Sequence, residues 1–227
     1  MSWLARLLAV FYQARCGGCG RWGEAWLCAG CRAAWPALPE TSCPRCACPL
    51  GADGCPDCEI GEWAFEATYA AGLYRGVARK AISALKYRGA RALAPLLATD
   101  VAARVPESAW LVVPVPIHRA RRGTRGYNQA ALLARAIARR RRWRYSDALR
   151  RRPSDPQQGL GRAARLANLD GAFSARRPLD GARVLLVDDV MTSGATAHHA
   201  AVALKRAGAA FVAVAVVART APDQAKE

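Results

Sequence analysis

The chain has 227 residues, which is enough for one medium-sized domain with a small additional module and too few for two large domains. Lys and Arg number 34 against 17 Asp and Glu, so the net charge is +17, while 52% of the residues are hydrophobic. This composition supports a packed core and excludes a wholly disordered protein. No apolar run approaches the ~20 residues that a membrane helix needs, so we expect no membrane insertion.

The first twelve residues are apolar, but they include Arg6 and run into cysteines without a small-residue cleavage site. We interpret residues 1–12 as a short amphipathic helix rather than a signal peptide. We therefore expect the chain in the cytoplasm, where nine cysteines favour metal binding over disulfides.

Eight of the nine cysteines form one pattern that is used twice, namely two CxxC pairs separated by eight residues. Each CxxC pair places two thiolates on one tight turn, and two such pairs complete a tetrahedral site of four sulfurs. Four cysteines leave no open position for water, so up to two structural Zn²⁺ ions are predicted. The predicted ligands are Cys16, Cys19, Cys28, Cys31, Cys43, Cys46, Cys55 and Cys58.

The spacing leaves two details of these cysteines open. The same sequence spacing is compatible with a cross-braced arrangement, in which the CxxC pairs combine in another order to hold the two metal ions. Cys48 could replace Cys46 as a ligand or be a free thiol. Residues 1–60, which we interpret as a double zinc-ribbon domain, carry no net charge, and this weakens a nucleic-acid role for them.

Residues 61–227 alternate between apolar strands and helical patterns, which predicts an α/β fold with a parallel sheet covered on both faces. A short linker at residues 59–63 separates them from the cysteines. We expect strands at residues 65–74, 110–115, 184–187 and 211–218, and helices at residues 77–87, 90–104, 127–144 and 195–207.

The excess positive charge lies in this second part, and thirteen arginines with one acid, Asp147, occupy residues 119–152. The planar guanidinium suits phosphate, so the cluster indicates a polyanionic partner such as nucleic acid. The alternative is a solvated basic face in a chain whose codons favour arginine.

The segment from Val184 to Thr196 (VLLVDDVMTSGAT) places two carboxylates, Asp188 and Asp189, at the end of an expected strand and a Thr/Ser/Gly loop before a helix. Ligands of open α/β sheets bind outside the carboxyl ends of strands. The loop N–H groups and the helix N-terminus form an anion cradle, and the carboxylates suit hydroxyls or a cation. A ribose 5-phosphate meets both requirements, although an Asp-Asp pair before a Thr/Ser helix cap also occurs in many α/β proteins.

This segment resembles the phosphoribosyl-pyrophosphate (PRPP) motif of the type I phosphoribosyltransferases. Over nearly its full length the chain also resembles the ComF family of competence-associated proteins. That resemblance rests on the paired zinc knuckles and, in order, on Lys86-Tyr87-Arg88-Gly89, Val113 to Pro116, Arg119 with Arg125 to Ala130, and Gln158 to Asn168. It implies a type I phosphoribosyltransferase-like parallel-sheet domain at residues 61–227, preceded by a small double zinc ribbon.

The resemblance also implies PRPP binding with Mg²⁺ and a link to DNA uptake in natural transformation. Asp188 and Asp189 would be the catalytic pair, holding the ribose hydroxyls and offsetting positive charge. Arg119, Arg122 and Arg125 would contact pyrophosphate, or else continue the basic surface, and residues 153–168 would form a mobile flap or a plain loop. The implied PRPP-binding residues are Asp188, Asp189, Val190, Met191, Thr192, Ser193, Gly194, Ala195, Thr196, Arg119, Arg122 and Arg125.

The sequence leaves open whether this protein is an enzyme. One hypothesis is a phosphoribosyltransferase with an unidentified acceptor, for which His118 is a better proton-transfer candidate than His198 or His199. The other is a non-catalytic protein that binds single-stranded DNA, or an adaptor whose ribbons dock a helicase or another uptake protein. We interpret His198 and His199 as packing or surface residues.

Overall fold

The computed structural model describes residues 14–23, 25–59, 62–118, 123–152 and 171–221. The helix predicted at residues 1–12, the flap predicted at residues 153–168, and Arg119 and Arg122 lie outside the described residues. Among the described helices, none combines the length and the apolar character needed to cross a membrane.

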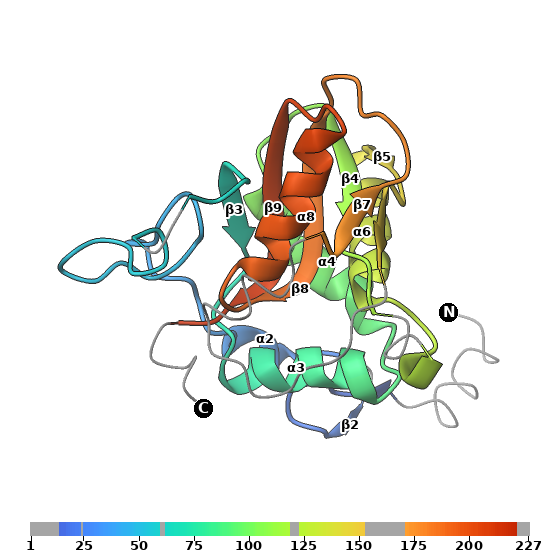
Figure 1. The fold of residues 1–227 in the computed structure, drawn as a ribbon. Helices are drawn as coiled ribbons and strands as arrows, with labels where there is room; N and C mark the ends of the chain where they lie inside the picture. The colour runs from blue at the N-terminus through green and yellow to red at the C-terminus, as the bar shows by residue number, and fades with distance from the viewer. Residues whose placement is uncertain (1–13, 24, 60–61, 119–122, 153–170, 222–227) are drawn as a thin grey trace.

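A five-stranded sheet with all its strands parallel forms the centre of the molecule (Figure 1). Its valine-rich strands are buried on both faces, which is why they read as continuous apolar runs. The predicted α/β parallel-sheet fold is therefore confirmed. In spatial order the strands are β3 (Ala67–Ala70), β9 (Phe211–Arg219), β8 (Arg183–Met191), β4 (Trp110–Pro114) and β5 (Arg144–Tyr145).

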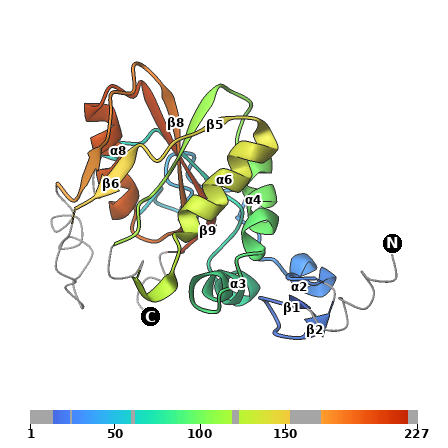
Figure 2. The same cartoon turned by 90° about the vertical axis from the view of Figure 1, so that its right-hand side faces the viewer.

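Helices cover both faces of the sheet (Figure 2). Side chains that alternate along each strand separate the two cores, so Val112 faces one set of helices and Val113 faces the other. The first core holds α3 (Gly76–Tyr87), α4 (Leu93–Arg104) and α6 (Gln129–Arg141), and the second holds α8 (Ala195–Arg206). An antiparallel hairpin of β6 (Leu149–Arg151) and β7 (Phe173–Ala175) packs beside α8.

Several predicted element boundaries were wrong. The strand expected at residues 65–74 is confined to β3, and the helix expected at residues 90–104 begins at Leu93. The strand expected at residues 184–187 continues to Met191, because β9 goes on pairing with it at Asp188↔Val216 and Val190↔Ala218. The two carboxylates therefore lie within a strand. The helix expected at residues 127–144 ends at Arg141, because Arg142 adopts a left-handed conformation (φ 56°) that stops it and lets the chain enter β5.

The two cysteine repeats pack against opposite faces of the sheet. The first repeat contains β1 (Ala14–Arg15), β2 (Trp22–Gly23) and α2 (Ala29–Ala33), and its Cys16 and Cys31 join the core of α3 and α4. Cys43, Cys46 and Cys48 of the second repeat join the core beside α8. In Figure 1 the first repeat lies beside α3 and the second beside β3. The domain boundary predicted near residue 60 stays a prediction.

Candidate functional site

The order of the strands creates a crevice between the carboxyl ends of β4 and β8. From β4 the chain passes through α6 to β5 on one side, whereas β8 and β9 lie on the other side of β4. The direction of winding therefore reverses between β4 and β8, and ligands of open α/β sheets bind at such a point. Pairing of β4 with β8 ends at Pro114↔Val187, so the continuation of β8 carries Asp188 and Asp189 along the crevice.

A polar pocket of about 190 Å³ lies in this crevice. It brings together five of the predicted site residues, four from the segment 188–196 and one, Arg125, from a distant part of the sequence. These five are Asp188, Asp189, Val190, Thr196 and Arg125. The other residues of its lining are Lys86, Tyr87, Val115, Pro116, Ile117, His118, Asn128, Gln129 and Arg151.

The acidic pair at the wall of this pocket includes a buried ion pair. Lys86 Nζ lies 2.8 Å from Asp189 Oδ2, and their side chains are 18% and 5% exposed. Asp188 Oδ1 accepts the Asp189 N–H at 2.8 Å, and Asp189 Oδ1 accepts the Val190 N–H at 2.9 Å. These contacts fix the orientation of both carboxylates.

The surroundings raise the proton affinities of both Asp188 and Lys86, for different reasons. Burial, together with the negative charge of Asp189, raises the pKa of Asp188 well above its usual range. Burial alone would lower the pKa of Lys86, but the Asp189 carboxylate outweighs this effect and raises it. Lys86 therefore stays protonated and offsets one of two adjacent negative charges. Outside the family motif, sequence reasoning gave Lys86 no role, because a lysine in the last turn of a helix is usually a surface residue.

The loop after β8 leads directly into α8. Its Gly194 has φ +80°, and a Cβ there would lie 3.0 Å from Met191 Cε and 3.2 Å from Trp63 Cη2. A side chain at this position would therefore be strained as well as crowded. The capping residue of α8 is Gly194, so no side chain at that position accepts the first N–H groups of the helix.

The segment after β4 is held in place at its far end. Asn128 caps α6 by accepting the Ala130 N–H at 3.0 Å, and its amide donates to the Val115 carbonyl at 3.0 Å. Arg125 lies over the Tyr87 ring at 4.6 Å and donates to Gln129 Oε1 at 3.3 Å. The guanidinium of Arg125 thus lies at the pocket that Asp188 and Asp189 also line.

The histidines occupy different surroundings. His118 lines the pocket. His198 accepts the Ala64 N–H at its Nδ1 (3.2 Å) and packs edge-on against Trp63, and burial lowers its pKa. The packing role that we predicted for His198 agrees with these contacts.

The chain is similar to a family of phosphoribosyl transferase domains and to proteins named for DNA utilization and competence. Residues 126–227 match the phosphoribosyl transferase domain family. The chain is 36% identical to DNA utilization protein YhgH of Escherichia coli O6:H1 (strain CFT073) over 48% of this chain and 49% of that protein. It is 26% identical to competence protein ComFC of Bacillus subtilis (strain 168) over 81% of this chain and 80% of that protein.

These relatives support the resemblance to the ComF family. The chain spans about half the length of most of the curated relatives that it matches. A solved structure, described as the allosteric regulatory enzyme of purine biosynthesis, aligns with 22% identity and a TM-score of 0.42 over 56% of this chain and 26% of that one.

In this chain the eight predicted cysteine ligands form two separate groups, and within each group the sulfurs lie within 4.8 Å of one another. Within the groups, Sγ–Sγ distances are 3.8 Å for Cys19–Cys28, 3.7 Å for Cys43–Cys58 and 3.3 Å for Cys46–Cys55. Four sulfurs at about 2.3 Å from a central zinc would lie about 3.8 Å apart, so the groups suit structural zinc. Each repeat closes its own group, which excludes the cross-braced arrangement, and the buried Cys48 is not part of either group.

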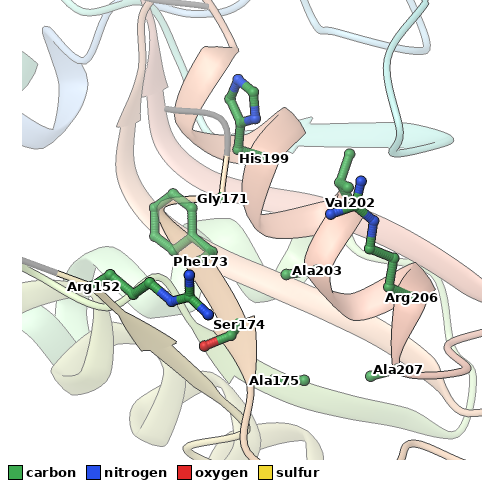
Figure 3. Close-up of a pocket in the computed structure, with 10 residues that line it drawn as sticks. All are labelled: Arg152, Gly171, Phe173, Ser174, Ala175, His199, Val202, Ala203, Arg206 and Ala207. Carbon is green, nitrogen blue, oxygen red and sulfur yellow. The ribbon is translucent and has the colours of Figure 1, made fainter. Parts of the chain in front are cut away.

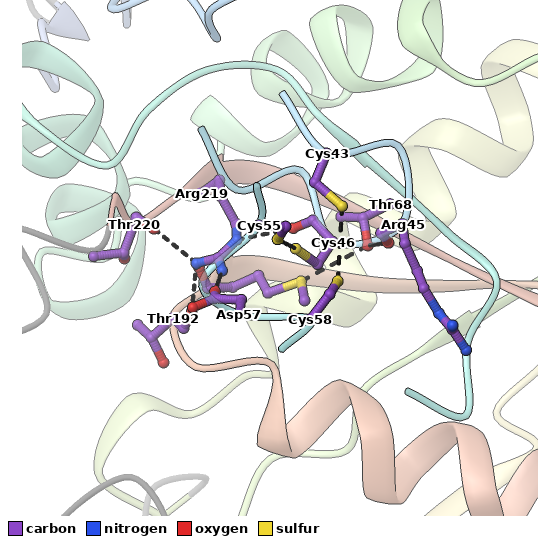
Figure 4. Close-up of polar contacts among 11 residues, drawn as sticks. Cys43, Arg45, Cys46, Cys55, Asp57, Cys58, Thr68, Thr192, Arg219 and Thr220 are labelled. Atoms are coloured by element: carbon purple, nitrogen blue, oxygen red, sulfur yellow. Dashed lines mark hydrogen bonds and ion pairs between the residues drawn. The ribbon is translucent and has the colours of Figure 1, made fainter. Parts of the chain in front are cut away.

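The buried side chain of Arg219 joins the second cysteine group to the loop after β8 (Figure 4). Arg219 is 1% exposed, ends β9, and forms an ion pair with Asp57, which lies between Cys55 and Cys58. Sequence reasoning missed this residue, because an arginine at the end of a predicted strand carries no signal of burial.

Two further cavities lie away from the crevice and share no lining residue with its pocket. One of about 340 Å³ lies between the β6–β7 hairpin and α8, where Arg152 and Phe173 face His199 and Arg206 (Figure 3). The other, about 720 Å³, lies at the amino ends of β4 and β8. Its lining includes Trp110, Trp143, Arg142, Arg144, Arg177 and Arg183.

Proposed function

We propose that this chain binds PRPP together with Mg²⁺ in the crevice between β4 and β8, and that it serves DNA uptake. The observation that carries the proposal is the set formed by the buried Asp189 and the half-buried Asp188 and Lys86, beside an uncapped helix N-terminus. One end of this crevice offers carboxylate oxygens and the other offers backbone N–H groups. Together they match a phosphorylated sugar.

The loop from Thr192 to Thr196 would hold the 5-phosphate. Its backbone N–H groups and the positive end of α8 attract an anion, and Gly194 permits the left-handed turn that leads into the helix. The hydroxyls of Thr192, Ser193 and Thr196 add donors.

The carboxylates of Asp188 and Asp189 would accept hydrogen bonds from the ribose hydroxyls. Lys86 stabilises this arrangement, because its positive charge offsets one of two neighbouring negative charges that burial disfavours. Mg²⁺ prefers oxygen ligands and keeps several waters, so carboxylate and phosphate oxygens at this wall suit it. When bound, Mg²⁺ supplies positive charge against the pyrophosphate, to which Arg125 and the predicted Arg119 and Arg122 would add.

The same arrangement suits transfer of ribosyl phosphate to a nucleophile whose identity is open. The bond from the anomeric carbon to pyrophosphate breaks, the bond to the nucleophile forms, and the carboxylates offset the positive charge that develops on the sugar. His118 on the pocket wall is the proposed acceptor of the proton that the nucleophile loses.

Calorimetry with PRPP and Mg²⁺ tests the proposal. We expect a binding heat for the wild type and none for Asp188→Asn/Asp189→Asn, because the neutral amides hold neither the hydroxyls nor Mg²⁺ as strongly. Asp147→Asn is the control, since it removes a carboxylate whose side chain is 59% exposed and does not line the pocket. Equal affinity in all three proteins would refute the site.

A pyrophosphate-release assay on the same proteins separates the two classes of function. Release by the wild type with a candidate acceptor, and its loss in the double variant, would identify a transferase. Binding heat without release would favour a protein that only binds PRPP.

A second candidate function, single-stranded DNA binding, is favoured by the 720 Å³ cavity at the amino ends of the strands. Arg142, Arg144, Arg177 and Arg183 line it, all exposed, and only one acid, Asp180, stands among them. Guanidinium groups around a hollow suit a phosphate backbone. The names of the relatives, a DNA utilization protein and a competence protein, agree with such a partner.

Salt-dependent binding of a labelled oligothymidine tests this second function. Arg142→Gln/Arg144→Gln removes two contacts, so the slope of log affinity against log salt should fall by about 1.4, at about 0.7 per phosphate contact. Arg79→Gln/Arg104→Gln, an equal loss of charge on exposed positions of α3 and α4, should leave the slope closer to that of the wild type. Equal slopes for both variants would mean that this cavity is not the DNA site.

A further inference from the structure

Arg219 is an unusual side chain for the core of an α/β sheet. It is a charged residue at the end of β9 and is 1% exposed. It is among the largest fully buried side chains of the described residues. A guanidinium has five N–H donors, and burying them is unfavourable unless acceptors surround them. The structure supplies such acceptors from two parts of the chain that the sheet does not connect.

On one side, Arg219 is held by the second cysteine group. Its Nε donates to the carbonyl of Cys46 at 2.9 Å, and its Nη2 pairs with the carboxylate of Asp57, which is itself buried. Cys46 is a predicted ligand, and Asp57 lies between two others. Residues 43–58 contain no helix or strand among the described elements, so their conformation depends on the four sulfurs being held together.

On the other side, Arg219 holds the loop that leads into α8. Its Nη1 donates to the carbonyl of Met191 at 3.1 Å and also to that of Thr192 (Figure 4). These carbonyls immediately precede Ser193 and Gly194. One guanidinium therefore holds the backbone carbonyls at the start of the loop that would bind phosphate.

A second contact connects the same two regions independently of Arg219. Trp63, which follows the second cysteine group, is buried and stacks on Phe65 at 5.5 Å. Its ring edge lies against Gly194, and the neighbouring Ala64 N–H donates to His198 on α8. The first cysteine group packs on the opposite face of the sheet, in the core of α3 and α4, so the two groups are not equivalent.

We propose that the second cysteine group sets the conformation of the 192–196 loop through Asp57 and Arg219, so that metal loss from this group alone abolishes phosphate binding. Arg219 is then a positioning residue, which acts through the backbone of Met191 and Thr192 and does not touch the ligand. This inference rests on the proposed phosphate-binding role of the loop, and it assigns the two metal groups different functions.

The decisive variant is Asp57→Asn/Arg219→Gln, because either single substitution would leave an unpaired buried charge and destabilise the whole protein. We expect it to retain two zinc ions per chain and to bind PRPP at least about tenfold more weakly than the wild type. Hydrogen–deuterium exchange should be faster in peptides covering residues 191–198 and unchanged in those covering β4 and α4. A globally loosened protein would show faster exchange in all of them.

Metal loss is tested with one cysteine variant in each group. Cys58→Ser should lose one zinc, with faster exchange at residues 191–198 and weaker PRPP binding. Cys19→Ser, the matched control in the first group, should also lose one zinc but keep both properties. Equal effects of the two variants on PRPP affinity, or wild-type affinity in Asp57→Asn/Arg219→Gln, would overturn the inference.

The exchange measurement keeps this inference distinguishable from the proposed function. If the wild type binds no PRPP, the proposed function fails, yet exchange at residues 191–198 still reports whether the second group holds the loop. If the wild type binds PRPP and exchange at this loop is the same in all variants, the coupling fails while the proposed function stands.

Discussion

Asp188 and Asp189 are neighbours in sequence, but they meet different surroundings. Successive side chains of a strand point to opposite faces, and because β8 continues past them, the two carboxylates separate. Asp189 pairs with Lys86, whereas burial and the charge of Asp189 disfavour ionisation of Asp188. Lys86 thus offsets the charge of Asp189, whereas the protein destabilises the charged form of Asp188. Carboxylates with shifted proton affinity are common at functional sites.

This arrangement predicts that Asp188→Asn stabilises the protein, increasingly so at higher pH. The folded-state pKa of Asp188 is raised, so the unfolded state binds fewer protons, and wild-type stability falls as pH rises from about 3.9 towards the folded pKa. The asparagine carries no such penalty. Its Tm should exceed that of the wild type by a few degrees, since about 1 kcal/mol shifts Tm by about 2–4 °C in a chain of this size.

The measurement is thermal unfolding of both proteins at about pH 5.5 and about pH 8, with bound zinc assayed at each pH because protonated cysteines release metal. The difference in Tm should be larger at the higher pH. Asp147→Asn, at an exposed position, serves as the control. A difference that is absent, or that shrinks as pH rises, would contradict the raised pKa.

At the scale of elements, the junction between β8 and α8 decides the shape of the site. β8 runs four residues beyond its last pair with β4, and then Thr192 to Gly194 turn the chain into α8. Gly194 makes the turn possible because its φ of +80° lies in the left-handed region. Met191 and Trp63 leave no room for a side chain there.

Gly194→Ala should therefore lower both stability and PRPP affinity. A left-handed alanine costs about 1–2 kcal/mol, and the contacts with Met191 and Trp63 add to this, so Tm should fall by at least about 2–4 °C. Gly30→Ala is the control, since nothing lies within 4 Å of its Cβ position and it is part of α2. Unfolding and calorimetry of both variants check the prediction, which fails if alanine is tolerated equally at the two positions.

At the scale of the whole molecule, the two cysteine repeats serve opposite faces of one sheet. Although their spacing is identical, Cys16 and Cys31 join the core of α3 and α4, whereas Cys43 and Cys46 join the core beside α8. Only the second repeat connects to the loop after β8, through Arg219. A duplicated sequence pattern thus acquires two different structural roles because the sheet offers it two different surfaces.

The features that the sequence predicted well are local. The two sets of four cysteines, the strand–loop–helix segment from residue 184 to 196 and the alternation of strands and helices all follow from spacing within short stretches. The end of β8 was not predictable in this way, because pairing with β9 extends it. Nor was the end of the predicted 127–144 helix, which depends on a left-handed Arg142 and on pairing with β4.

The sequence by itself therefore determined the class of fold, the metal-binding groups and one wall of the crevice, because each depends on residues close together in the chain. Only the tertiary structure decided that Lys86 neutralises Asp189, that Arg125 stands beside them, and that Arg219 meets Asp57 from 162 positions away. Each of these is a charged side chain whose burial is tolerable only beside a partner, and the partner is chosen by the packing of distant segments.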